Sequence, residues 1–299
     1  MIDREVELLL PAGVSPPVLA PPPGLPSRRA SLVAGVNALF RSRESRAPAP
    51  LLHDPYAHLF GERHPLIWGL RALRFALPPL RRMIDELQIA HCVRHRSIDE
   101  LCLRAARRDR FGQIVILGAG YDSRALRLAP LLPDVRWFEV DHPATAARKT
   151  RLAARAGITW TAGRVMVDLQ RDPLAPALAA VGFDPAAPAC FVLEGLAHYL
   201  DRSAFRQLLG AAAPPGRPRR IILSYIDRRM AASAPSLFVA LVRLLREVPV
   251  THFDRGELAA LAGLTLTGHW TFSEQVQQLL AAGAPPAPRL SQDVATLDA

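Results

Sequence analysis

The sequence predicts an α/β protein in which a doubly wound, mostly parallel sheet follows an N-terminal helical cap. Three observations predict it. Short apolar runs rich in β-branched residues recur along the middle of the chain, helical patterns separate them, and a glycine-rich turn follows the first run. Alternating strands and helices are typical of doubly wound sheets. The chain has 299 residues, 50% of them hydrophobic, which suffices for one large domain.

The first part of the chain is predicted to be helical after a proline-rich arm. Residues 1–27 contain "SPPVLAPPPGLPS", a proline density that sustains neither helix nor central strand. Residues 28–110 are predicted to form a helical cap and lead-in helices. Within them, 31–46 has helical spacing, Asp54 and Pro55 are placed to begin a helix, and 81–108 is a further helical stretch.

The predicted core of the sheet covers residues 111–283. Its strands are the apolar runs at 113–117, 135–140, 164–168, 190–194 and 220–226, with 264–272 as a last candidate. A lid insertion is expected near 227–256, which includes an amphipathic helical pattern at 233–248. The proline-rich, polar segment 284–299 is expected to be a flexible tail.

Composition and charge exclude several classes of function. The net charge of +10 comes almost wholly from arginine, since Lys149 is the only lysine, and the arginines are spread along the chain. We therefore expect no nucleic-acid partner. Three widely spaced cysteines predict neither a metal site nor a disulfide framework. Without a signal peptide or a membrane-spanning run, a cytoplasmic protein is expected that does not bind membranes.

The turn after the first strand, "GAGYDSR", is the first candidate ligand site. Gly118 and Gly120 would let the backbone approach a ligand closely. A dinucleotide fingerprint needs a third glycine where Ser123 stands. Asp122 would repel a phosphate at the following helix and would favour a cationic ligand. Whether Asp122 touches a ligand or only caps the helix stays open.

Acidic residues end the next strands at the same predicted edge of the sheet. Asp141 comes about 20 positions after Gly120, where an acid commonly binds ribose hydroxyls. Asp168 could accept a hydrogen bond from an adenine amino group, and the Leu169 amide could donate one to the ring. A nucleoside without phosphate and with a positive charge fits these groups. S-adenosylmethionine is such a ligand.

The amino-acid part of such a ligand requires both an acid and a base. Glu194 ends the fourth predicted strand and could hold an ammonium group. Arg94 and Arg96 precede the first strand on a predicted helix, and either could pair with a carboxylate. Two residues apart on a helix, they point about 200° from each other, so one of the two is expected in the site.

Together the motifs resemble those of the leucine carboxyl methyltransferase family, close to its bacterial branch that acts on polyketides and other small metabolites. The matching pieces lie at about residues 30–210 and are "RESRAPAPLLHDPYA", "VRHRSIDE", "VILGAGYDSRALRL", "FEVDHPATAARK", "VDLQRDP" and "LEGLAHYL". The resemblance implies a class I, Rossmann-like methyltransferase sheet of seven strands that binds S-adenosylmethionine. It also implies O-methylation of a small acceptor that carries a carboxylate or an acidic hydroxyl.

The resemblance assigns roles to individual positions. It implies that Arg94, with Arg96 as a substitute, binds the cofactor carboxylate and that Glu194 lies by the methionine moiety. The other implied cofactor residues are Gly118, Gly120, Asp141 for the ribose, and Asp168 and Leu169 for the adenine.

The acceptor and its chemistry are less sharply specified. A carboxylate acceptor is already ionised and needs no base, whereas a phenol would benefit from one. His198 and Tyr199 are the possible catalytic residues, and we expect no dedicated base. The cap residues Arg41, Arg43 and Arg46 could attract an acidic acceptor. The alternatives left open are a tRNA-modifying carboxyl methyltransferase, an NAD(P)-dependent oxidoreductase and a binding protein without turnover, and the oligomeric state is not predicted.

Overall fold

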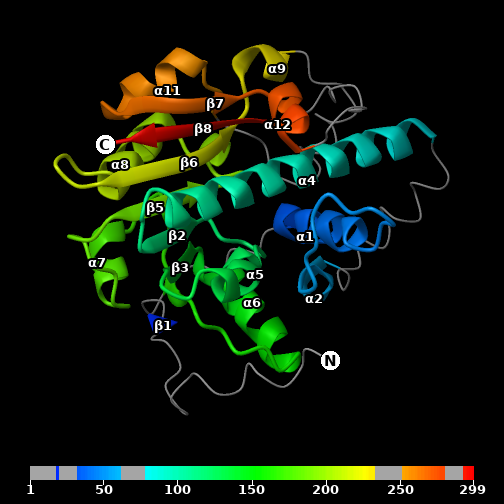
Figure 1. Cartoon of the computed structure of the whole chain (residues 1–299), viewed down its shortest axis with the longest axis horizontal. Helices are drawn as coiled ribbons and strands as arrows, with labels where there is room; N and C mark the ends of the chain where they lie inside the picture. The colour runs from blue at the N-terminus through cyan, green and yellow to red at the C-terminus, as the bar shows by residue number, and fades with distance from the viewer. Residues whose placement is uncertain (1–17, 20–31, 62–77, 233–250, 280–291) are drawn as a thin grey trace.

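The structure is a computed structural model that describes residues 18–19, 32–61, 78–232, 251–279 and 292–299. Its centre is a sheet with the strand order β1-β4-β3-β2-β5-β6-β8-β7 (Figure 1). The strands are β1 (Val18–Leu19), β2 (Gln113–Leu117), β3 (Arg136–Asp141), β4 (Gly163–Met166), β5 (Ala189–Leu193), β6 (Arg219–Tyr225), β7 (Thr265–Trp270) and β8 (Asp293–Asp298).

Parallel pairing dominates this sheet. All pairs from β1 to β6 are parallel, and β8 is antiparallel to both of its neighbours, β6 and β7. The mostly parallel seven-stranded sheet that the sequence predicts is therefore confirmed, and β1 adds a two-residue strand at one edge. β2 begins and ends at the predicted residues because all five of its side chains are apolar or amide groups that become buried.

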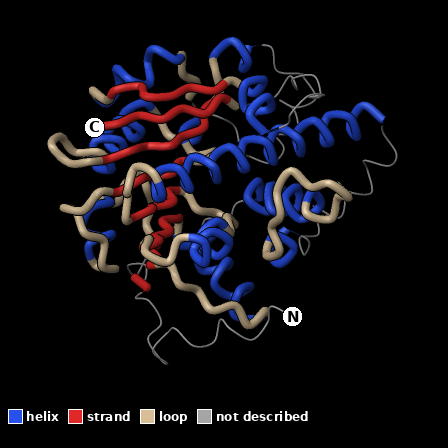
Figure 2. The backbone as a smooth tube through the Cα atoms, in the orientation of Figure 1, coloured by secondary structure: helices blue, strands red, loops and turns tan. Residues whose placement is uncertain are grey.

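Helices cover both faces of the sheet, so that three layers form (Figure 2). One core cluster packs α7, α8 and α11 on one face, and a second packs α1, α4, α5 and α6 on the other. The helices are α1 (Leu32–Glu44), α2 (Ala57–Gly61), α4 (Pro78–Arg107), α5 (Arg124–Leu128), α6 (Pro143–Arg155), α7 (Leu174–Ala179), α8 (Arg202–Ala212), α9 (Arg228–Ala232), α11 (Arg255–Ala262) and α12 (Phe272–Leu279), and short 3-10 turns lie at Ala129–Leu131 and Ala197–Tyr199.

The N-terminal helices lie beside the long helix α4, which crosses the face of the sheet (Figure 1). The predicted helix start at Asp54 and Pro55 precedes the observed one, because α2 begins at Ala57 after a turn at residues 55–56. Oδ1 of Asp54 accepts hydrogen bonds from the backbone N–H groups of Tyr56 and Ala57, each at 3.1 Å. A carboxylate at this position satisfies N–H groups that have no partner within the helix. Asp201 caps α8 in the same way, through the Ala204 N–H at 2.8 Å.

The expectation of a flexible tail at 284–299 is wrong for its last residues. Strand β8 inserts between β6 and β7, and Val294, Ala295 and Leu297 are fully buried there. Arg220 of β6 fixes the end of β8 through two bonds to Asp298, at 2.8 and 2.7 Å. Pairing along both edges gives hydrogen-bond partners to the backbone N–H and C=O groups of β8. This pairing stabilises a short strand that has only three apolar side chains.

Three sequence predictions fall on residues outside the description. They concern the proline-rich arm at 1–27 apart from β1, the amphipathic pattern at 233–248 within the expected lid, and the part of the tail at 284–291. Among the described residues, no helix combines the length and the apolarity that crossing a bilayer requires.

Candidate functional site

The candidate site lies where the winding of the sheet reverses. From β2 the chain builds outward through β3 and β4, and it then returns to place β5 on the other side of β2. The loops that follow β2 and β5 therefore diverge at the carboxyl ends of two neighbouring strands. Open α/β sheets bind ligands in the crevice that forms at such a point. The glycine turn follows β2, and Glu194 directly follows β5.

The glycine turn needs its glycines for two reasons. Gly118 and Gly120 adopt φ angles of 65° and 47°, in the left-handed region that other residues avoid. Space is also short, because a Cβ at Gly118 would lie 3.0 Å from the Leu196 side chain and one at Gly120 would lie 3.2 Å from Ala34 Cβ. The turn is thus held between the loop after β5 and the cap helix α1.

Asp141 joins the end of β3 to this turn. Its Oδ2 accepts a short hydrogen bond from the Gly120 N–H, and its Oδ1 accepts one from the His142 N–H at 2.6 Å. Burial raises the pKa of Asp141, although both N–H groups oppose the shift. Each carboxylate oxygen has a second lone pair, so the side chain is fixed and can still accept bonds from hydroxyl groups.

Asp168 and Leu169 follow β4 at the same edge of the sheet. The Asp168 side chain is buried, and its Oδ1 accepts a bond from the Gln170 N–H at 3.1 Å. Asp172 closes the turn, because its Oδ2 accepts the Asp168 N–H at 2.8 Å. Leu169 packs partly buried against the core. The predicted strand ended at Asp168, but β4 already ends at Met166.

Arg94 of α4 and Glu194, which directly follows β5, form an ion pair. Arg94 Nε donates to Glu194 Oε1 at 3.1 Å, and the two side chains are 9% and 8% exposed. Burial alone would raise the pKa of Glu194, but His95, Arg94 and Arg124 hold it well below its usual value. The pair therefore places a fixed positive group and a fixed negative group in direct contact with each other.

Arg96 points away from this pair. It forms an i,i+4 ion pair with Glu100 on the exposed side of α4, and its side chain is 41% exposed. Of the two arginines that the sequence offered, the structure therefore brings only Arg94 to Glu194. The reason is the helical geometry of α4, which sends side chains two positions apart in nearly opposite directions.

Asp122 has a partner within the protein. Its Oδ1 accepts the Arg124 N–H at 2.7 Å, and its Oδ2 forms a short ion pair with the Arg124 guanidinium. Arg124 is fully buried and also bonds Asp99 at 2.6 Å and Glu194 at 2.9 Å. Asp122, which precedes the N-cap residue Ser123, thus pairs with Arg124, so its charge has a partner within the protein.

These contacts belong to a larger buried charge network that sequence reasoning missed. It links helices α1, α4 and α5 with the loop after β5, and four arginines face four carboxylates. Its members are Arg41, Arg94, Arg124, Arg127, Asp54, Asp99, Asp122 and Glu194, with His91 and His95 among them. A signal was present in α4, where His91, His95 and Asp99 recur every four residues and so share one helix face.

Arg41 is part of this network, which corrects one expectation. The cap arginine was expected to attract an acidic acceptor, but its side chain is buried and bonds Asp54 at 2.8 Å. It also donates to the Tyr121 carbonyl at 2.6 Å, within the glycine turn. Burial would raise the pKa of Asp54, yet Arg41 and Arg127 lower it to about 2. Arg41 therefore ties the cap to the turn.

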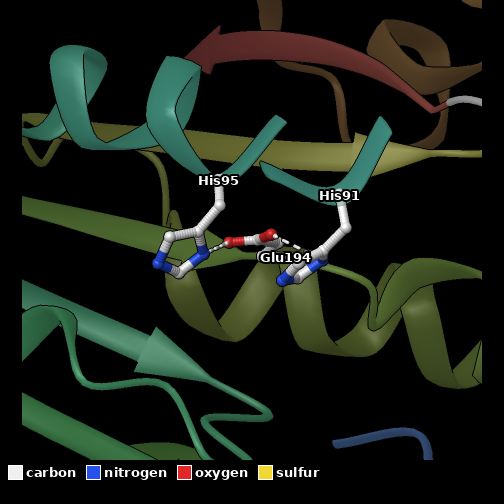
Figure 3. A group of neighbouring side chains, drawn as sticks. All are labelled: His91, His95 and Glu194. Carbon is white, nitrogen blue, oxygen red and sulfur yellow. Dashed lines mark hydrogen bonds and ion pairs between the residues drawn. The ribbon is translucent and has the colours of Figure 1, made fainter. Parts of the chain in front are cut away.

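A metal ion is a possible occupant by distance alone. His91, His95 and Glu194 each place one ligand atom within 4.8 Å of the others (Figure 3). However, Arg94 Nη2 lies 2.8 Å from His91 Nδ1, and Arg127 Nη2 lies 2.8 Å from His95 Nε2. Guanidinium groups remain charged at all accessible pH values and would repel a cation. The donor set favours a ligand with charges of both signs.

His198 and Tyr199 lie in the 3-10 turn that follows Glu194, with ring centroids 4.3 Å apart. Nδ1 of His198 is buried and has no hydrogen-bond partner among the described residues. Burial, together with the charges of Arg94 and His252, lowers the pKa of His198 to about 3. His198 is therefore neutral and a weak base in this environment.

Comparison with known proteins identifies related chains. The family model of leucine carboxyl methyltransferase matches residues 34–213, which is more than half of the chain. A relative from Mycolicibacterium smegmatis, provisionally named an S-adenosyl-L-methionine-dependent methyltransferase, is 38% identical over 68% of this chain and 68% of its own length. Similarly named relatives are 36% identical in Mycolicibacterium vanbaalenii and 34% identical in Mycobacterium tuberculosis, over 64% and 66% of this chain. The matches span 65% and 56% of those two relatives.

Solved structures agree on the fold. A DUF574 family protein from Streptomyces avermitilis superposes with a TM-score of 0.62 at 14% identity, covering 90% of this chain and 97% of that one. A protein from Thermobifida fusca, provisionally described as a methyltransferase, gives 0.59 at 17% identity over 93% and 98%. At such low identity the likeness shows a shared α/β fold of the methyltransferase type.

Proposed function

We propose, because this chain belongs to the leucine carboxyl methyltransferase family, that it transfers the methyl group of S-adenosylmethionine to an oxygen atom of a small metabolite. S-adenosylmethionine supplies a methyl group on a positively charged sulfur. The protein's residues would bind this cofactor at the carboxyl ends of β2, β3, β4 and β5, bring the acceptor oxygen into line with the methyl carbon and exclude water.

The observation that carries the proposal is the buried pair of Arg94 and Glu194. The amino-acid end of the cofactor has one carboxylate and one ammonium group. Arg94 would bind the carboxylate, and Glu194, whose pKa is held low, would bind the ammonium and favour the sulfonium. A ligand with both charges satisfies both side chains at once, and a ligand with one charge satisfies only one of them.

The nucleoside end of the cofactor would lie along the neighbouring strand ends. Asp141, fixed by two backbone N–H groups, would accept bonds from the ribose hydroxyls. Asp168 and the Leu169 amide would serve the adenine, and the glycine turn would allow the close approach of the backbone. Gly118, in the left-handed region, and Gly120 would line the cofactor between these groups.

A dinucleotide is disfavoured by the start of α5. A pyrophosphate would need free N–H groups at this helix start, but Asp122 already accepts the Arg124 N–H. Ser123 stands where a third glycine would be required, and its hydroxyl accepts a bond from Arg127 at 3.2 Å. These contacts support a ligand without phosphate over NAD(P).

The acceptor is proposed to be a carboxylate or an acidic hydroxyl group. A lone pair of its oxygen attacks the methyl carbon, the carbon–sulfur bond breaks, and its electrons stay on the sulfur, which becomes neutral. A carboxylate has no proton to lose and needs no base. With a pKa of about 3, His198 could not efficiently accept the proton of a phenol, which supports the more acidic acceptors.

Cofactor binding is tested by isothermal titration with S-adenosylmethionine and, separately, with NADH. We expect binding of the former alone, and binding of NADH alone would refute the proposal. Asp141→Ala should weaken binding of S-adenosylmethionine by at least ~1 kcal/mol through lost ribose bonds. Asp134→Ala, an exposed aspartate before β3, is the matched control and should leave the affinity unchanged.

Turnover is tested by release of S-adenosylhomocysteine with a panel of small carboxylic acids, phenols and tRNA. We expect turnover with members of the first class and methyl esters in the mass spectrum of the products. Retention on tRNA with a steep salt dependence would instead support a tRNA-modifying enzyme. Tight cofactor binding without turnover on any acceptor would support a binding protein.

A further inference from the structure

We propose that His95 is a positioning residue that presents one oxygen of Glu194 to the ammonium group of the cofactor, and that Arg127 fixes the required tautomer of His95. The inference rests on the proposed function, because it concerns the same site. The sequence motifs assign no role to His95 or to Arg127, and both residues act here through the Glu194 carboxylate.

The two oxygens of the Glu194 carboxylate have unequal surroundings. Oε2 accepts two bonds, from His95 Nδ1 at 2.9 Å and from Arg124 Nη2 at 2.9 Å. Oε1 accepts one bond, from Arg94 Nε at 3.1 Å, while His91 Nδ1 at 3.9 Å is too distant to donate. Since each oxygen can accept two bonds, Oε1 keeps one acceptor position with respect to the described residues.

The tautomer of His95 follows from its neighbours. Its Nε2 faces Arg127 Nη2 at 2.8 Å, and arginine can only donate, so Nε2 must be the unprotonated acceptor. Nδ1 then carries the proton and donates to the ionised Glu194. Arg124 Nη2 also lies 3.1 Å from Nδ1, because both groups donate to the same oxygen.

Arg127 is itself held in place by Asp99. Nη1 of Arg127 bonds Asp99 Oδ2 at 2.7 Å, and Nη2 bonds Oδ1 at 3.2 Å. A two-point contact of this kind fixes the plane of the guanidinium group and aims Nη2 at the ring. A chain of contacts therefore runs from Asp99 through Arg127 and His95 to Glu194, and every member is nine-tenths buried or more.

A neutral ring is required for this arrangement. Burial lowers the pKa of His95, although Glu194 opposes the shift. The ring therefore stays neutral at physiological pH and keeps one donor and one acceptor nitrogen. If Arg127 were removed, the ring could take the other tautomer, and Nδ1 would lose its bond to Glu194 Oε2. The carboxylate would then be free to rotate and would offer Oε1 less often to a ligand.

Two isosteric substitutions separate the two ring nitrogens. His95→Asn places an amide N–H near the position of Nδ1, whereas His95→Gln places its amide near Nε2. The affinities are measured by titration with S-adenosylmethionine and with methylthioadenosine, which lacks the amino-acid end. We expect His95→Gln to weaken binding of S-adenosylmethionine by about tenfold or more, as the loss of a charged hydrogen bond does, and His95→Asn to stay within about threefold.

Methylthioadenosine is the control for a merely structural role. Both variants should bind it as the wild-type protein does, because its contacts lie at Asp141 and Asp168. The inference would be overturned if His95→Asn and His95→Gln lost affinity for S-adenosylmethionine equally. It would also be overturned if a variant lost affinity equally for S-adenosylmethionine and methylthioadenosine. If the wild-type protein does not bind S-adenosylmethionine at all, the proposed function fails instead, and the wild-type titration shows this before any variant is made.

A measurement on the wild-type protein gives an independent check. Nitrogen-15 NMR of the His95 ring should show a protonated Nδ1 and an unprotonated Nε2. Arg127→Met should increase the population of the other tautomer, which is protonated at Nε2. The same variant should lose affinity for S-adenosylmethionine and keep its affinity for methylthioadenosine. A ring protonated at Nε2 in the wild-type protein would contradict the role assigned to Arg127.

Discussion

At the scale of single residues, His198 is the clearest test of how the methyl acceptor is activated. Its ring is buried, and its pKa of about 3 leaves it neutral at physiological pH. With a carboxylate acceptor, His198→Asn should lower kcat by less than about tenfold and leave the shape of the pH–rate profile unchanged, because general bases contribute about 10²–10⁴-fold. The measurement is kcat against pH for both proteins. A loss above about 100-fold, with a vanished limb in the profile, would identify His198 as a base.

At this scale the sequence located two side chains at the carboxyl ends of strands, while their roles in binding stay predictions. Glu194 and Asp141 could be placed because parallel strands bring their carboxyl ends to one edge. Arg124 could not, since an arginine in a helix is ordinarily exposed. Its burial depends on three carboxylates, Asp99, Asp122 and Glu194, that arrive from separate elements. No local pattern around position 124 contains that information.

At the scale of elements, the ion pair of Glu139 and Lys149 joins β3 to α6. The two atoms Oε2 and Nζ lie 2.9 Å apart, and both side chains are buried. Burial raises the pKa of Glu139, although Lys149 opposes the shift. Lys149→Met should lower the free energy of unfolding by about 3 kcal/mol, because it leaves a buried carboxylate without its partner. Urea unfolding measures this difference.

The double variant Glu139→Gln with Lys149→Met is the control for that prediction, since it removes both charges. It should recover most of the stability. The cost of Lys149→Met alone should also be smaller at pH 5 than at pH 8, because protonation of Glu139 removes the unpaired charge. If the double variant is less stable than Lys149→Met, the pair contributes through packing rather than through charge.

Among the elements, a bounded apolar run was predictable and a short polar strand was not. β2 was found because four of its five residues are apolar and all five are buried. β8 has the sequence "DVATLD", in which two acids flank four residues of mixed polarity. Its strand conformation comes from pairing with β6 and β7 along both edges. Tertiary pairing of this kind is invisible in a local reading of the sequence.

At the scale of the whole molecule, arginines contribute both to the net positive charge and to the buried charge network. The net charge of +10 first indicates a basic surface. Inside the protein, however, four arginines are balanced by four carboxylates in the buried charge network, and two neutral histidines lie among them. The balance depends on the histidines remaining uncharged, which links the integrity of the site to pH.

This link predicts that the protein loses stability in mild acid. The pKa values of His91, His95 and His198 are lowered in the folded state, with burial as the largest cause. Below the unfolded pKa of about 6.5, the unfolded chain binds protons that the folded protein does not. Unfolding is therefore favoured progressively as pH falls, by up to about 4 kcal/mol per pH unit for three such groups. Asp54, with a pKa of about 2, contributes loss only below about pH 4.

Urea or thermal unfolding at about pH 7.5, 6 and 5 measures how the free energy of unfolding changes with pH. The contribution of the buried histidines is expected to grow as the pH falls through this range. His198→Asn should reduce the slope below pH 6.5 by about a third, because one of three proton-binding differences is removed. His58→Asn, at an exposed histidine of α2, is the matched control and should keep the wild-type slope. Equal stability from pH 7.5 to 5 would mean that the histidines take up protons in the folded state. The buried charge network would then carry excess positive charge in mild acid, and affinity for S-adenosylmethionine should change over the same pH range.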